Sequence, residues 1–214
     1  MRTERTNVHR LPQKQVFDTY VVRTILARAI LAHVAISVEG QPYSLPLVCA
    51  PFADELLLHG SNASRLFKVL SSGAPACVSI TLVDGLVLAR SAFESSMHYH
   101  SLIALGSARV IQENEKEAAL LALTGHLFPE RGKELRASTE QELRATSLLA
   151  FPLTEVSVKV SSGPVDDPEA DLQSDVWAGI VPITSSYGEP IASQDLKSGI
   201  EIPDYISGWP KNRT

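Results

Sequence analysis

Cysteine is scarce in this sequence, with only Cys49 and Cys77 among 214 residues, and both lie within apolar runs. A chain of this length can bury about 70% of the surface that its unfolded form exposes, so it needs no disulfide or metal to fold. We therefore expect two small buried thiols and not a disulfide framework.

Long apolar runs and an excess of basic residues are also missing. No stretch approaches the roughly 20 apolar residues of a membrane span, and the polar first 14 residues lack the apolar segment of a secretory signal. The 19 Lys and Arg residues are scattered and are outnumbered by 24 Asp and Glu, which gives a net charge of -5. These features predict a cytoplasmic protein that binds neither membranes nor nucleic acid.

Several familiar catalytic and binding motifs are absent. The sequence contains no Gly-x-Gly-x-x-Gly, no Gly-x-x-x-x-Gly-Lys-Ser/Thr and no Gly-x-Ser-x-Gly, which argues against a dinucleotide-binding turn, a P-loop and a serine hydrolase. His98 and His100 lie on one side of an extended segment, but no nearby third ligand accompanies them. We therefore predict no metal site and identify no catalytic residue.

Hydrophobic periodicity predicts a mainly β protein with flanking helices. Helices are expected over residues 16–30 and 63–70, and two capping-box patterns predict helices over 115–128 and from 139 to about 150. Short apolar or alternating runs predict strands over 33–38, 43–50, 56–58, 76–82, 85–89, 102–110, 153–160 and 176–182. We expect an N-terminal arm over 1–15, one domain over 16–183 and an irregular tail over 184–214.

The segment from Leu57 to Lys68 suggests a binding site. An apolar strand leads into a turn and a helix, and the turn carries Ser61, Ser64 and Arg65. Hydroxyl groups, amides at a helix start and a guanidinium group together favour a phosphate. A plain N-capped helix with a surface arginine explains the same residues equally well.

Four separated blocks of the sequence carry a resemblance to a known family. They are His59-Gly-Ser-Asn-Ala-Ser-Arg-Leu66, Asp84-Gly-Leu-Val-Leu-Ala-Arg-Ser91, Met97-His-Tyr-His-Ser-Leu-Ile-Ala-Leu-Gly106 and Val176-Trp-Ala-Gly-Ile-Val-Pro182. In this order they resemble the flavin-binding split-barrel proteins related to pyridoxamine 5'-phosphate oxidase, most closely the branch that includes the nitroimidazole-resistance proteins. The resemblance covers about residues 10–183.

The resemblance implies an FMN-binding split β-barrel that forms a homodimer with the cofactor at the interface. It places Ser44, Leu45 and Pro46 along the isoalloxazine ring of the cofactor. His59 and Gly60 are expected beside the ribityl chain and phosphate, with Ser64 and Arg65 on the phosphate itself. Ser101 is expected to offer a polar contact from a later strand, and Trp177 an aromatic ring from the neighbouring subunit. Ser61 joins this set because it lies in the same turn.

The function implied is that of an FMN-dependent oxidoreductase that takes electrons from NAD(P)H and passes them to a small organic acceptor or oxygen. The alternative is a non-catalytic flavin- or haem-binding protein for sensing or sequestration, in which His59, His98 or His100 serves a haem. Pyridoxamine-phosphate oxidase activity itself is disfavoured, because the chain has no counterpart of the basic C-terminal Arg-Leu-x-Pro segment of those enzymes.

At one position the chain departs from its branch, which usually has Asn-Tyr-Arg-Ser where this sequence has His98-Tyr-His-Ser101. A side chain that is always charged is thus replaced by one that can be neutral near pH 7.

Overall fold

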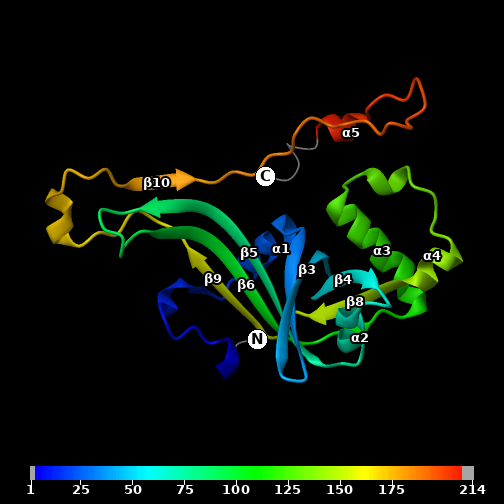
Figure 1. Ribbon diagram of the computed structural model, residues 1–214, viewed down its shortest axis with the longest axis horizontal. Coiled ribbons are helices and arrows are strands. Elements are labelled where there is room, and N and C mark those ends of the chain that lie inside the picture. The colour runs from blue at the N-terminus through cyan, green and yellow to red at the C-terminus, as the bar shows by residue number, and fades with distance from the viewer. Residues whose placement is uncertain (1–2, 209–214) are drawn as a thin grey trace. The chain divides into compact units, whose positions relative to one another are not determined.

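A single antiparallel sheet forms most of the structure, a computed structural model that describes residues 3–208 (Figure 1). Within these residues ten strands pair in the order β1-β9-β6-β5-β2-β3-β4-β8-β7, and β10 pairs with β5 outside this path. The strands are β1 (Gln15–Val16), β2 (Leu31–Val38), β3 (Gln41–Phe52), β4 (Glu55–Ser61), β5 (Pro75–Leu88), β6 (Ser96–Ser107), β7 (Arg109–Val110), β8 (Thr146–Pro152), β9 (Val156–Ser161) and β10 (Gly179–Pro182). The helices are α1 (Thr19–Arg28), α2 (Arg65–Ser71), α3 (Glu113–Leu127), α4 (Glu140–Ala145) and α5 (Asp204–Ser207), with short 3-10 turns at Glu4–Thr6, Pro12–Lys14, Arg131–Lys133 and Glu169–Gln173. The predicted mainly β fold with flanking helices is confirmed.

The long strand β3 bends the sheet into a barrel. Its first part, to Val48, pairs with β2, and its second part, from Cys49, pairs with β4. Because β6 also contacts β8, strands from both ends of the path enclose one core. The predicted hairpin over 33–50 corresponds to β2 and β3 and is confirmed.

Two groups of buried apolar side chains fill the structure. The larger lies within the barrel, where Phe67 of α2 and Phe151 of β8 are among the largest side chains with almost no exposed surface. The smaller lies between α3 and the outer side of β4 and β8, and it includes Leu57, Leu123 and Leu148. Side chains therefore occupy the barrel interior, as is usual for small barrels.

One predicted helix is too long and two predicted strands are joined into one, because long-range pairing decides these elements. The helix expected from 139 to about 150 ends at Ala145, because the apolar run Leu148–Phe151 is buried as a strand against β4. The strands expected over 76–82 and 85–89 are one strand, β5, which continues through an irregularity between Val83 and Gly85 where its register with β6 shifts.

Helix starts are only partly as predicted. Thr139 caps α4 with Glu142 as expected, and hydrogen bonds from Arg136 and from the Thr139 amide lower the pKa of Glu142 to about 2. The expected pair of Asn114 with Glu117 does not cap α3, whose capping box is formed by Gln112 and Glu115.

Other boundaries shift by a few residues. Helix α1 starts at Thr19, where the preceding Asp18 side chain accepts from the Tyr20 amide, and not at residue 16. Strand β6 begins at Ser96 and ends at Ser107, so the strand predicted over 102–110 starts too late. The last two strands are shorter than expected, with β9 starting at Val156 and β10 at Gly179.

The chain divides into one compact unit that ends at Ile183 and a second that begins at Thr184. In its described residues the second unit has one short helix, α5; the rest of the predicted tail, 209–214, and the first two residues of the predicted arm lie outside the described residues. No helix within residues 3–208 is long and apolar enough to cross a membrane. Cys49 is buried, which raises its pKa to about 12, and Cys77 is half-buried; both are free thiols.

Candidate functional site

The turn between β4 and α2 is held by the two serines that the sequence singles out. The Ser61 carbonyl accepts from the Ser64 amide at 3.0 Å, and the Ser61 hydroxyl accepts from the Ala63 amide at 3.2 Å. Ser64 is the N-cap of α2, and its hydroxyl accepts from the Phe67 amide at 3.4 Å. The strand thus extends to Ser61 and the helix begins at Arg65, later than predicted. Because both hydroxyl groups accept from backbone amides, their protons remain available to a ligand.

Gly60 precedes this turn and is needed for packing. A Cβ atom at this position would lie 2.2 Å from the ring of Phe67, which is only 2% exposed. The ring therefore lies directly over the backbone of β4 and fixes how the first turn of α2 rests on the strand. The resemblance implies a place beside the cofactor for Gly60, which stays a prediction, and the contact with Phe67 gives this glycine a structural role.

The guanidinium group of Arg65 lies over an aromatic ring at the edge of the barrel. Its central carbon is 5.1 Å from the centroid of the Tyr43 ring, a cation-π distance. Arg65 is exposed, and no carboxylate in residues 3–208 forms an ion pair with it. Its hydrogen-bond donors are therefore available for an anion at the same turn as the Ser61 and Ser64 hydroxyl groups.

Strand β3 carries the three residues that are predicted to lie along the flavin, and their side chains do not all face the same side of the sheet. Ser44 pairs with Ala35 and Pro46 with His33, and these residues face out of the barrel, whereas Leu45 pairs with the buried Val34. Leu45 is nevertheless 40% exposed at the barrel edge. A ligand lying on the outer face would meet the Ser44 and Pro46 side chains but only the backbone of Leu45.

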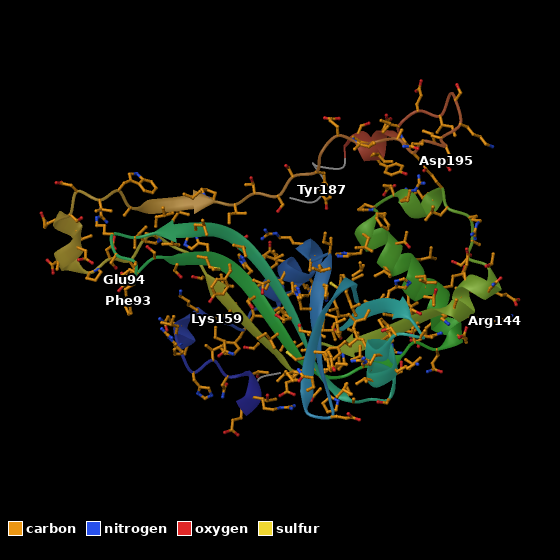
Figure 2. The ribbon with its side chains drawn as sticks, in the orientation of Figure 1. Phe93, Glu94, Arg144, Lys159, Tyr187 and Asp195 are labelled. Atoms are coloured by element: carbon orange, nitrogen blue, oxygen red, sulfur yellow. The ribbon has the colours of Figure 1, made fainter. Side chains whose placement is uncertain are left out.

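Ser101 lies on the same outer face, across β2 and β5. Pro46 pairs with His33 of β2, His33 pairs with Ser79 of β5, and Ser79 pairs with Ile103 of β6, so Ile103 lies on this face. Ser101 is two residues from Ile103 on β6 and therefore faces the same side. Ser101 lines a surface pocket of about 350 Å³ with Val8, Thr81, Met97, Tyr99, Ile103, Ser157 and Lys159. Figure 2 shows Lys159, which donates to the Arg10 carbonyl at 3.4 Å.

His59 and Trp177 are accessible but lie in different places. His59 is near the end of β4, opposite Leu148, and partial shielding by protein atoms lowers its pKa. Trp177 is 67% exposed, and its ring covers Gly179 at the start of β10. Figure 1 shows β10, which starts two residues after Trp177, far from α2.

A further polar cluster connects α1, β5 and β6. His100 Nδ1 lies 2.7 Å from Asp84 Oδ2, and Arg28 Nη2 donates to Asp84 Oδ1 at 3.1 Å. Partial burial alone would raise the pKa of Asp84, but the hydrogen bonds from His100 and Arg28 outweigh it and lower the pKa. The sequence indicated His100 as a departure from the resembling branch, but it gave no sign of the contacts with Asp84 and Arg28.

We predict that Asp84→Asn destabilises the protein at neutral pH by up to about 1 kcal/mol, the usual range for partly exposed ion pairs. Since the pKa of Asp84 is lowered on folding, its contribution is present above the ordinary pKa of an aspartate, near 3.9, and is lost as pH falls through the folded value. Melting temperatures measured between about pH 7 and pH 3 should show the gap between wild type and variant closing at the acid end. Asp54→Asn removes the same charge from an exposed turn and is the control. A gap that stays constant over this pH range would contradict the prediction.

The profile of the pyridoxamine 5'-phosphate oxidase family matches residues 18–160. The chain belongs to this family. The family predicted from the four sequence blocks is thus confirmed, and the curved antiparallel sheet described above is consistent with its split barrel.

Two solved structures of this family resemble almost the whole chain. The FAD and haem binding protein from Mycobacterium smegmatis is 40% identical, with a TM-score of 0.88 over 91% of this chain and 96% of that chain. The flavocytochrome Anf3 from Azotobacter vinelandii is 32% identical, with a TM-score of 0.91 over 96% of each chain. A candidate 5-nitroimidazole antibiotic resistance protein from Bacteroides thetaiotaomicron shares the fold at 22% identity, with a TM-score of 0.58 over 68% of this chain and 86% of that chain. No curated protein matches significantly.

Within the oxidase-family fold, the predicted site residues fall into three places. His59, Gly60, Ser61, Ser64 and Arg65 lie in one short segment, from the end of β4 to the start of α2. Ser44, Pro46 and Ser101 share the outer face of the sheet, and Trp177 lies beyond β5. The contacts of these residues with a cofactor stay predictions.

Proposed function

We propose that this member of the oxidase family binds a flavin nucleotide and a haem and acts as an oxidoreductase. The observation that carries the proposal is the 40% identity, over 91% of the chain, with a protein named for binding FAD and haem. The second full-length relative is named as a flavocytochrome. The proposal combines the flavin expected from the sequence with the haem that the sequence allowed as an alternative.

The residues around the start of α2 fit the phosphate end of a flavin nucleotide. The Ser61 and Ser64 hydroxyl groups can each donate a hydrogen bond, and Arg65 adds a guanidinium group that no carboxylate within residues 3–208 neutralises. The Tyr43 ring holds that guanidinium at the barrel edge, next to the strand that carries Ser44 and Pro46. Arg65 thus connects the donors for the phosphate with β3, the strand expected to meet the ring.

The form of the flavin is FAD in our proposal. The resemblance implied FMN, but the relative at 40% identity carries FAD in its name. Either nucleotide presents a phosphate to the Ser61, Ser64 and Arg65 turn, so the donor set does not depend on the choice.

A homodimer with the cofactor at its interface is part of the proposal. The barrel interior is filled by side chains such as Phe67 and Phe151, so a tricyclic ring must lie outside it. The outer face of the sheet supplies one wall for such a ring, and in the proposed dimer Trp177 of the second copy approaches it.

The bound cofactors would supply hydride and single-electron chemistry, with NAD(P)H as electron donor and a small organic molecule or oxygen as acceptor. The protein groups described here bind and orient them.

The test is a spectroscopic analysis of the purified full-length protein. We expect both flavin absorption and a Soret band, FAD as the flavin released on denaturation, and anaerobic bleaching of the flavin by NADH or NADPH. Chromatography distinguishes FAD from FMN. A protein that carries flavin but is reduced by neither nucleotide would support the non-catalytic alternative. A protein that takes up neither FAD nor FMN on reconstitution would contradict the proposal.

A further inference from the structure

We propose that His100 is the protein ligand of the haem iron, which it binds through Nε2, and that Asp84 and Arg28 position it. This inference rests on the haem half of the proposed function. The three residues come from β6, β5 and α1, and they form a chain of hydrogen bonds from imidazole to carboxylate to guanidinium with distances of 2.7 Å and 3.1 Å.

The contact with Asp84 determines which ring nitrogen of His100 carries the hydrogen. An ionised carboxylate only accepts hydrogen bonds, so Nδ1 donates to it and the lone pair of the neutral ring lies on Nε2. Histidines that bind metals almost always donate their other ring N–H to a carboxylate, a carbonyl group or water, which fixes the ring and strengthens it as a donor. His100 has this arrangement before any ligand is added.

Arg28 gives the carboxylate a second partner. The Asp84 carboxylate is thus bonded from two sides, by His100 through Oδ2 and by Arg28 through Oδ1. These two contacts hold the carboxylate, and with it the imidazole ring, in place.

His100 has apolar neighbours and remains partly accessible to solvent. On the neighbouring strands it lies opposite Leu82 and Val160, two half-buried apolar residues. Its side chain is 28% exposed, so the ring is neither enclosed in the core nor fully in water. No three His, Cys, Asp or Glu side chains gather into a metal site anywhere in residues 3–208, but a haem needs only one protein ligand because the porphyrin supplies four nitrogen atoms.

The other histidines of the described chain are less suited to this role. Four have no carboxylate within hydrogen-bond reach in residues 3–208 to orient the ring, namely His9, His33, His59 and His98. The fifth, His126, has Nε2 only 2.6 Å from the Ala29 carbonyl, which uses the nitrogen that would face a metal. His98 is the most informative of these, because it lies two residues from His100 on the same side of β6.

The test compares haem binding by His100→Ala, His100→Gln and the control His98→Ala. After reconstitution with hemin, we expect both His100 variants to lose at least about 100-fold in haem affinity, since removal of an outer-shell partner alone costs about 10–100-fold. His98→Ala should bind haem as wild type does, and added imidazole should restore a low-spin spectrum to His100→Ala. Flavin content and melting temperature report whether each variant is folded.

A second readout concerns the positioning residue. Asp84→Asn should bind haem about 10- to 100-fold more weakly than wild type, less than the loss in the His100 variants, and should raise the midpoint potential of the bound haem, because a less polarised imidazole donates more weakly to the iron. Wild-type haem affinity and spectrum in both His100 variants would overturn the inference, as would haem loss confined to His98→Ala. If the wild-type protein itself takes up flavin but no haem, the haem half of the proposed function fails instead, and this outcome is seen before any variant is made.

Discussion

Replacing Gly60 with alanine is expected to lower the free energy of unfolding by about 2–3 kcal/mol, in the upper part of the usual range for overpacking. The added Cβ atom would overlap the Phe67 ring, three of whose atoms lie within 2.8 Å of that position. The ring is 2% exposed and packed into the main core, so it cannot move away without disturbing other buried side chains. Urea unfolding followed by circular dichroism measures the loss.

Two further variants make this test specific. Gly125→Ala lies within α3 with no atom near the added methyl group, and it should stabilise the protein by about 0.5–1 kcal/mol. Phe67→Leu shortens the side chain that meets the Cβ atom, so the double variant should lose less stability than the two single changes together. Strict additivity of Gly60→Ala and Phe67→Leu would show that the two residues do not compete for this space.

The sequence predicts those parts of the fold in which neighbouring residues decide the structure. The hairpin of β2 and β3 follows from two apolar runs, the first rich in β-branched residues, on either side of Gly40, which adopts a φ of 80° in the turn. The start of α4 follows from Thr139 and Glu142, which bond to each other's backbone. By contrast, the run Leu148–Phe151 is apolar throughout, and periodicity alone cannot distinguish a buried helix from a buried strand. Its pairing with β4, about 90 residues earlier in the chain, decides the matter.

The candidate site shows the same division between local and distant information. Ser61, Ser64 and Arg65 lie within five consecutive positions, so one strand end and one helix start bring them together. Arg28 and Asp84 are 56 residues apart, and they meet only because α1 packs against the barrel near the irregularity in β5. No local pattern signals such a contact. The position of Leu45 was also unpredictable, because the register of β3 on β2 decides which face each side chain takes.

Arg65→Ala is expected to weaken flavin binding by about 1.5–3 kcal/mol, the range for a hydrogen bond to a charged group, which corresponds to roughly a 10- to 150-fold higher Kd. The guanidinium group is exposed at the turn of Ser61, Ser64 and Arg65. Its stacking on Tyr43 already restricts the Arg65 side chain, so less conformational entropy is lost when the ligand binds. Arg65→Lys should recover only part of the affinity, because it restores the charge but not the planar set of donors. Titration of the apoprotein with FAD and with FMN, followed by quenching of flavin fluorescence, measures each Kd.

Lys68→Ala is the matched control for Arg65→Ala, since it removes one positive charge from an exposed position on the same helix. Its Kd should stay within about twofold of wild type, because an exposed charge away from the ligand is largely screened by salt. Loss of the Tyr43 contact should cost only about 0.5–1 kcal/mol of stability, so Arg65→Ala remains folded at the temperature of the titration. If both variants weaken binding equally, the effect is one of general charge and Arg65 has no special place at the phosphate. If neither does, the turn is only an N-capped helix start with a surface arginine, and the flavin must be held elsewhere.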